Sequence, residues 1–266
     1  MPKRRRFPVA LSLLVALVTA AVPAAALAGG RSGAGLQRID RVEDCEENVP
    51  VAISASPTPG GTTIALNLLV LHDGVLKTDA EAIVAKAAPA YSPLNLSLVA
   101  TYRKVAFVGD KGVNPPQARA DALVAEAKTL LGGTRPVGTD IVFVLTNKDV
   151  YLSGGDATGY ADCIGGIRYP NRSFALGEAI VPTESVGPFT FYLNGTAKVL
   201  AHEIGHLLGA RHEHSNCAQG VGAEDLFNSE PSACTLMIAY MDLQSLHFGT
   251  PEAMIVRAHA ENYAAP

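Results

Sequence analysis

The segment from Ala201 to His214 contains three histidines whose spacing suits the binding of one metal ion. His202 and His206 are four residues apart, so on a helix they lie on one face, about one turn apart. Gly209 can adopt a positive φ, which ends the helix and lets His212 return as a third ligand. Three imidazole ligands leave the fourth position of a tetrahedral zinc ion open to water, which is typical of a catalytic site.

Glu203 follows the first of these histidines directly and would lie beside the ion without binding it. A carboxylate in that place can take the proton of a zinc-bound water, whose pKa the metal lowers toward about 7. An amphipathic helix has no packing reason to place three histidines on one face. We therefore expect one catalytic zinc ion with Glu203 as general base, and the sequence leaves structural calcium open. His214 is expected to be a neighbour of the site, because a fourth protein ligand would close it.

The pattern His202-Glu203-X-X-His206-X-X-Gly209-X-X-His212 resembles the extended zinc signature of the metzincin metalloendopeptidases. Those enzymes carry a methionine turn beneath the metal, and residues 234–240 resemble this turn, with Met237 as its methionine. Tyr240 follows Met237 by three positions, whereas the metal-binding tyrosine of some family members follows by two.

Two further features resemble the reprolysin, or adamalysin, group of metzincins, namely the cysteine directly before the turn and the segment 159–166. The resemblance covers roughly Thr62 to the C-terminus. It implies a mixed α/β (α+β) zincin fold, with a twisted sheet, an antiparallel edge strand, an active-site helix and a small C-terminal subdomain. It also places an edge strand beside the zinc, where unpaired backbone groups receive an extended peptide. The residues expected in that strand are Gly159, Tyr160, Ala161 and Asp162.

The apolar patterns predict an alternation of strands and helices, which indicates a mixed α/β domain with one sheet. Strands are expected over residues 62–72, 94–108 and 140–145, with a further pair over 159–167 and 174–181. Helices are expected over residues 78–88, 115–131, 196–208 and 251–261, the last with Thr250 as its N-cap.

The N-terminal 28 residues are typical of a secretory signal peptide. Four basic residues over 3–6 precede an apolar run over 9–22, and Ala26-Leu27-Ala28 is a small-residue cleavage site. Arg4-Arg5 also fits a twin-arginine signal, and both routes lead out of the cytoplasm to a secreted or periplasmic location.

Three parts are expected along the chain. Residues 1–28 form the signal peptide, and residues 29–61, rich in Gly, Pro, Ser and acid, form a linker or short pro-segment. Residues 62–266 form one metalloprotease catalytic domain, long enough to bury its own core.

Charge limits the partners of the mature chain. Without the signal, 17 basic side chains face 25 acidic ones, a net charge of −8, and no basic cluster remains for nucleic acid. No later segment approaches the roughly 20 uninterrupted apolar residues that cross a bilayer, so no membrane anchor is expected after signal removal. The expected partner is a protein or peptide substrate, and the oligomeric state is left open.

Four cysteines suggest two disulfides in an oxidising compartment. Cys217 and Cys234 both lie between the zinc signature and the methionine turn, so we expect them to pair. By elimination Cys45 pairs with Cys163. The alternative is that Cys45 is a zinc-binding latch in a removable pro-segment, although its acidic neighbours disfavour the thiolate that a ligand must be.

Three functions are compatible with these residues. The first is a secreted zinc endopeptidase. The second is a metal-dependent amidase acting on a non-protein substrate, and the third is a catalytically silent zinc-bearing binding module. Glu203 favours the two enzymes over the silent module, because loss of the general base is how such a fold becomes silent.

Overall fold

The computed structural model describes residues 43–45, 62–108, 117–152, 155–179, 190–212, 235–238 and 246–264. All of them belong to one compact unit, Leu36–Pro266. The expected signal peptide and most of the expected linker lie outside the described residues, as do four singled-out side chains: His214, Cys217, Cys234 and Tyr240.

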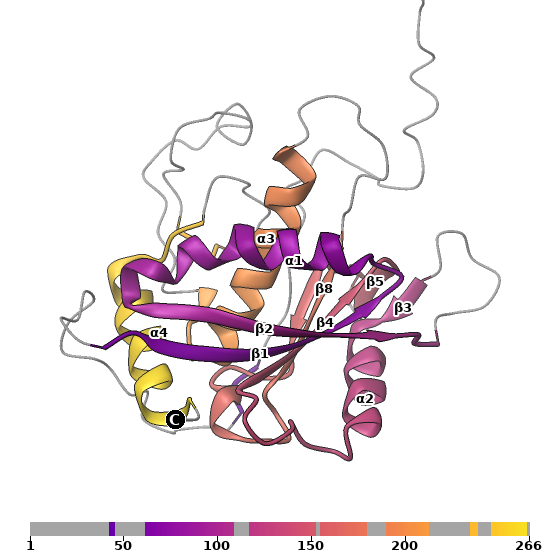
Figure 1. The fold of residues 1–266 in the computed structure, drawn as a ribbon, viewed down its shortest axis with the longest axis horizontal. Helices are drawn as coiled ribbons and strands as arrows, with labels where there is room; N and C mark the ends of the chain where they lie inside the picture. Colours follow the sequence, from indigo (N-terminus) through magenta and orange to yellow (C-terminus); the bar gives the residue numbers. More distant parts are fainter. Residues whose placement is uncertain are drawn as a thin grey trace, which may run out of the picture. The chain divides into compact units, whose positions relative to one another are not determined.

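A five-stranded twisted sheet, in the order β2-β1-β4-β8-β7, forms the centre of this unit (Figure 1). Its strands are β1 (Ile64–Asp73), β2 (Leu96–Val105), β4 (Ile141–Thr146), β7 (Gly159–Ala161) and β8 (Phe174–Glu178). All pairs are parallel except β7 with β8, which is antiparallel at one edge. Every residue of β4 is buried, as expected for a parallel strand covered on both faces. The expected mixed α/β fold with an antiparallel edge strand is confirmed.

Helices cover both faces of the sheet (Figure 1). α1 (Lys77–Ala87) and α3 (Thr190–Leu207) lie on one face, and α2 (Ala120–Leu130) lies on the other. α4 (Thr250–Tyr263) lies near the start of β1 and β2, where Arg257 Nη1 donates to the carbonyl oxygen of Leu94 at 3.0 Å. α1 and α2 each bury residues at helical positions i, i+3, i+4 and i+7, which explains why both form amphipathic helices. None of the described helices is both long and apolar enough to span a membrane.

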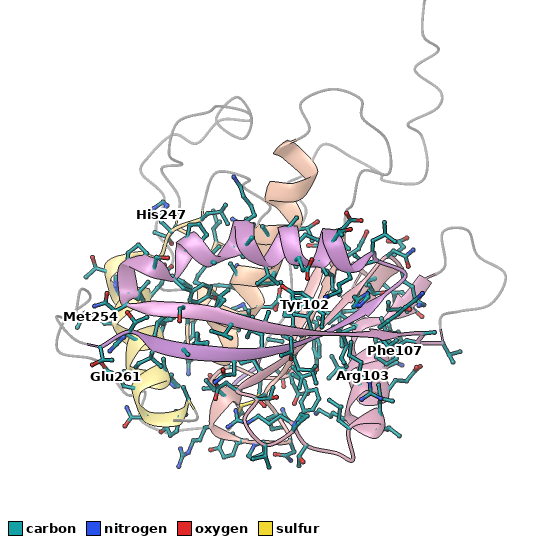
Figure 2. All side chains as sticks on the ribbon, viewed as in Figure 1. Tyr102, Arg103, Phe107, His247, Met254 and Glu261 are labelled. Atoms are coloured by element: carbon teal, nitrogen blue, oxygen red, sulfur yellow. A yellow bond between two sulfur atoms is a disulfide. The ribbon has the colours of Figure 1, made fainter. Side chains whose placement is uncertain are left out.

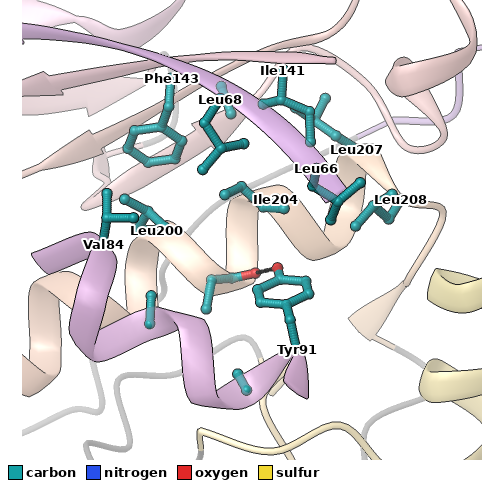
Figure 3. Close-up of a cluster of buried hydrophobic side chains, with 14 of the residues drawn as sticks. Leu66, Leu68, Val84, Tyr91, Ile141, Phe143, Leu200, Ile204, Leu207 and Leu208 are labelled. Carbon is teal, nitrogen blue, oxygen red and sulfur yellow. Dashed lines mark hydrogen bonds between the residues drawn. The ribbon is translucent and has the colours of Figure 1, made fainter. Parts of the chain in front are cut away.

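The larger apolar cluster lies between the sheet and the layer of α1 and α3. Leu68 of β1 and Phe143 of β4 face Leu200 and Ile204 of α3 in this cluster (Figure 3). All four side chains are almost completely buried. Because α3 carries two of the three signature histidines, this packing fixes their helix against the centre of the sheet.

Three short 3₁₀ helices connect these elements, over Ala88–Ala90, Ser92–Leu94 and Gly166–Arg168. A second, three-stranded sheet was not predicted. It consists of β3 (Gln117–Arg119), β5 (Asp149–Leu152) and β6 (Gly155–Asp156). The predicted helix over 115–131 is therefore wrong at its start, because residues 117–119 pair in parallel with 149–151 and the helix begins only at Ala120. A pairing between segments so far apart leaves no local signal in a three-residue strand.

Two other helix starts differ from the prediction. α3 begins at Thr190 rather than at residue 196. The N-cap of α4 is Gly249 and not Thr250, because the side chain of Glu252 accepts the backbone N–H of Gly249. The backbone N–H of Gly249 at the start of the helix is thus satisfied by the carboxylate of Glu252, whereas the sequence predicted a cap by the hydroxyl of Thr250.

Residues Glu43–Cys45 of the expected linker lie against the loop that follows β7. Asp44 forms an isolated parallel bridge with Ile164, and its carboxylate lies 2.6 Å from Nη2 of Arg211. A disulfide joins Cys45 to Cys163, with 4.9 Å between their Cα atoms. The same pair is predicted from the sequence by elimination. The disulfide ties residues 43–45 to the loop that follows β7.

Candidate metal centre

The three histidines of the signature meet at one point. His202 and His206 project from α3, and His212 follows the turn at the end of that helix. The Nε2 atom of His202 lies 3.1 Å from both other Nε2 atoms, and those of His206 and His212 are 3.2 Å apart. Zinc–nitrogen bonds of about 2.0–2.1 Å in a tetrahedron place the ligand atoms about 3.3 Å from one another. The triangle therefore has the size that three ligands of one such ion require.

Backbone carbonyls determine which nitrogen of two rings carries the proton. Nδ1–H of His202 donates to the carbonyl oxygen of Leu236 at 2.9 Å, and Nδ1–H of His206 donates to that of Ala210 at 2.8 Å. Both rings are fully buried. Their Nε2 atoms consequently face each other and that of His212, so all three can donate a lone pair to one cation. Three imidazole nitrogens are a donor set that fits zinc.

The end of α3 brings the third histidine into place. Gly209 has φ of +87°, its N–H donates to the carbonyl of His206 at 2.8 Å, and the N–H of Ala210 donates to that of Gly205 at 3.0 Å. These two bonds form a Schellman motif, which ends the helix and reverses the chain. A Cβ atom on Gly209 would lie 2.4 Å from Cε1 of His259, so glycine is required for space as well as for φ.

Glu203 is fully buried between α3 and the edge strand β7. A Cβ atom on Gly159 of that strand would lie 2.2 Å from its Oε1. The ring of Tyr91 supports the same stretch of α3, because its hydroxyl donates to the carbonyl of Ala201 at 2.6 Å (Figure 3). Burial, and secondly the charge of Glu203, raise the pKa of Tyr91 well above its usual value, so this hydroxyl remains a donor.

Met237 lies beneath the metal-binding helix, where the resemblance to metzincins places a turn methionine. It is fully buried, and a Cβ atom on Gly205 would lie 2.7 Å from its sulfur. Gly205 is the fourth residue of the His-Glu-X-X-His pattern, so its lack of a side chain lets the thioether approach the helix backbone. The neighbouring Leu236 supplies the carbonyl that orients His202. The turn thus touches both the helix and one candidate ligand.

Sequence reasoning missed Glu252, a fully buried carboxylate that holds this turn. Its Oε1 accepts the hydroxyl of Thr235 at 2.6 Å, directly before Leu236. Burial raises the pKa of Glu252, while the bonds from Thr235 and Gly249 and the charge of Lys198 act in the opposite direction. In the sequence, Glu252 is marked only as an acid in the first turn of a predicted helix. That position indicates a helix cap, and it does not indicate the bond to Thr235, 17 residues away.

Comparison with known families gives one match that decides the membership of this chain. Residues 79–213, just over half of the chain, match the profile of the family described as metallo-peptidase family M12B, reprolysin-like. The chain belongs to this family. The predicted relationship to the metzincin zinc metallopeptidases is confirmed, and so is the prediction of a hydrolase acting on peptide bonds.

The fold is that of a solved archaemetzincin. Archaemetzincin from Methanopyrus kandleri is 22% identical, with a TM-score of 0.50 over 76% of this chain and 98% of its own. Metalloproteinase-II from Bacteroides fragilis is 18% identical, with a TM-score of 0.46 over 80% of this chain and 59% of its own. A comparison with curated protein sequences gives no significant match.

The edge strand of this M12B metallopeptidase is shorter than the sequence suggests. β7 ends at Ala161, and among the described strands it pairs only with β8. Asp162 follows the strand, and its carboxylate lies 2.8 Å from Nζ of Lys128 and 2.9 Å from Nε of Arg172. These ion pairs turn the carboxylate toward α2 and the following loop, so Asp162 anchors the end of the strand.

Histidines without metal spacing serve the fold. Nδ1–H of the buried His72 donates to the carbonyl of Val75 at 2.8 Å. His247 has an exposed side chain ahead of α4 (Figure 2), while its backbone carbonyl accepts the N–H of Leu236 at 2.7 Å. His259 is buried on α4, and its Nδ1–H donates to the carbonyl of Ile255 at 3.0 Å.

We expect His259 to make the free energy of unfolding fall in mild acid. Burial lowers its pKa in the folded state, the hydrogen bond to Ile255 acts against this, and the charge of Arg168 acts in the same direction as burial. The unfolded chain then binds a proton below pH ~6.5 that the folded chain does not, so stability is complete above that pH and is lost as pH falls. Urea unfolding of the zinc-loaded protein at pH 7.0 and 5.5 should show a smaller loss for His259→Gln than for wild type. Equal losses in both proteins would refute this assignment.

Proposed function

We propose that this metallopeptidase is a secreted, zinc-dependent endopeptidase. His202, His206 and His212 hold one zinc ion, and Glu203 is the general base. The observation that carries the proposal is the convergence of three Nε2 atoms within 3.2 Å of one another, with the fully buried Glu203 next to the first of these histidines in the sequence. Metal ligands and a base brought together at the end of one helix are what hydrolysis of an amide requires.

A zinc ion held by the three histidines would supply a Lewis acid for the scissile carbonyl and would lower the pKa of a water toward about 7. Glu203 accepts one proton from the water while the water oxygen attacks the carbonyl carbon. It then passes this proton to the leaving nitrogen as the C–N bond breaks, so one water is consumed and no charge is left over. The carbonyls of Leu236 and Ala210 hold the rings of His202 and His206 throughout.

The edge strand supports an endopeptidase over an enzyme that binds chain ends. We propose that Gly159, Tyr160 and Ala161, with Asp162 anchoring their end, bind the main chain of an extended substrate. The outer edge of a strand binds any peptide backbone through its N–H and C=O groups, and the side chain of the substrate is selected elsewhere.

The three-part organisation and the secretion signal also belong to this proposal. Residues 1–28 act as the signal, residues 29–61 as a linker, and residues 62–266 as the catalytic domain. The disulfide from Cys45 to Cys163 supports a tether rather than a latch, because a disulfide-bonded sulfur is not available as a thiolate ligand. A disulfide also fits an oxidising, extracytoplasmic location. Pairing of Cys217 with Cys234 stays a prediction.

Mass-spectrometric mapping of cuts in a peptide library tests the proposed function. We expect cuts at internal peptide bonds, abolished by a chelator and restored by zinc, with a preference at one or more positions around the cut bond. Cuts confined to chain ends would contradict the endopeptidase. Hydrolysis of glycan-linked or small amides without any peptide cut would favour the non-protein amidase, and zinc binding without hydrolysis would favour the silent module.

A further inference from the structure

The candidate base lies directly on a residue of the edge strand. Gly159 is buried, and its missing side chain faces α3, where a Cβ atom would meet Oε1 of Glu203 at 2.2 Å and Cδ at 2.8 Å. The same atom would lie 2.8 Å from Cγ1 of Val199, one helical turn earlier. The carboxylate of Glu203 therefore fills the space that any side chain at position 159 would need.

Neighbouring residues show that this requirement is specific to position 159. Ala161 lies two residues along β7, on the same face of the strand, and its methyl group is buried in the cluster shared with α3. Gly177 lies directly opposite Gly159 in the β7–β8 ladder. The atoms nearest to a Cβ atom on Gly177 would be Cζ of Phe143 at 3.0 Å and Cγ1 of Val199 at 3.1 Å. Both are apolar, and each would have to shift by only a few tenths of an ångström.

A methyl group at position 159 would move the base more easily than it would break the fold. Real carbon–oxygen contacts are about 3.2 Å or longer, so Oε1 would have to retreat by about 1 Å. The carboxylate is the far end of a flexible side chain, and rotation about its χ angles can provide that shift. A displacement of about 1 Å at a reacting group can cost about 10²-fold in rate, even where stability changes little.

We propose that Gly159 is a positioning residue for Glu203, whose absent side chain sets the place of the carboxylate between the helix and the edge strand. The strand proposed to bind substrate then also fixes the base, so the two parts of the site share one backbone segment. This inference rests on the proposed role of Glu203 as general base.

Gly159→Ala and its matched control Gly177→Ala test the kinetic consequence. We expect Gly159→Ala to lower kcat by about 10²-fold, with little change in KM and with wild-type zinc content, because the ligands are untouched. Gly177→Ala should keep kcat within about threefold of wild type, because its methyl group meets no reacting group. Wild-type kcat in zinc-loaded Gly159→Ala would overturn the inference. Inactive wild-type enzyme would instead contradict the proposed function.

A stability cycle tests the contact without any activity. Glu203→Gln keeps the size of the side chain, whereas Glu203→Ala removes the atoms that the new methyl group meets. We expect Gly159→Ala to lower the Tm in the wild-type and Glu203→Gln backgrounds by similar amounts, and to lower it clearly less in the Glu203→Ala background. Equal losses in all three backgrounds would mean that the methyl group meets something other than Glu203, which would refute the inference even if Gly159→Ala folds too poorly for kinetics.

Discussion

Glu203→Gln should lower kcat by at least about 10²-fold while the protein keeps its full zinc content. Glutamine has the size of glutamate and fits the same buried space between α3 and β7, but it cannot accept a proton at neutral pH. The three imidazoles are unchanged, so metal affinity should be unchanged too. Steady-state kinetics on a peptide found by library mapping, with zinc measured on the same sample, gives both numbers.

The matched control is Glu261→Gln, which removes a glutamate from the exposed end of α4 where it pairs with Arg257 Nε at 2.7 Å. Its kcat should equal that of wild type. A fall in kcat and in kcat/KM by the same factor would place the lost interaction in the transition state, as expected for a base. Turnover close to that of wild type in folded, zinc-loaded Glu203→Gln would remove Glu203 from the mechanism.

The metal-binding triad was predictable because its geometry is local. His202 and His206 share a helix face by their spacing alone, and one residue, Gly209, accounts for the turn that returns His212. The positive φ of +87° and the Schellman bonds are the consequences that the glycine predicts. The long strands and the four main helices were predictable for the same reason, since apolar periodicity is read within one element.

What supports the triad was not predictable, because each support comes from a distant part of the chain. Tyr91 bonds to Ala201 across 110 residues. Asp44 reaches Arg211, the residue before His212, from the expected linker. No pattern within a window of sequence indicates such pairs, because they depend on how α1, α3 and the edge loop pack together. The short strand β3 escaped prediction on the same ground, because it pairs with the distant strand β5.

Two glycines of this chain have packing roles that the amino-acid sequence alone does not indicate. Gly205 and Gly159 occur in predicted elements as residues of weak propensity, yet each leaves space for a particular side chain, the thioether of Met237 and the carboxylate of Glu203. The sequence predicts Glu203 from its place directly after the first histidine, and Met237 from the resemblance to metzincins. Only the packing of α3 on β7 and on the methionine turn shows that the glycines and these partners depend on one another.

Removal of one imidazole should release the metal. We expect His206→Ala to lower zinc affinity by more than the roughly 10–100-fold that loss of an outer hydrogen-bond partner costs, and to abolish peptide hydrolysis. The remaining Nε2 atoms of His202 and His212, 3.1 Å apart, offer only two of the three protein ligands that a catalytic zinc site requires. Competition with a chelator of known affinity measures the loss.

His247→Ala is the control for this prediction, because His247 is a histidine of the same unit that lies outside the triad. Its side chain is exposed, and its bond to Leu236 is made by the backbone carbonyl, which the substitution keeps. It should keep both zinc and activity. His206→Ala with full zinc occupancy under the same competition would show that the ligands have been wrongly named. If both proteins are folded and only His206→Ala loses zinc, the metal is assigned to the triangle of Nε2 atoms at the end of α3. The imidazole removed in that variant is the one that the carbonyl of Ala210 orients.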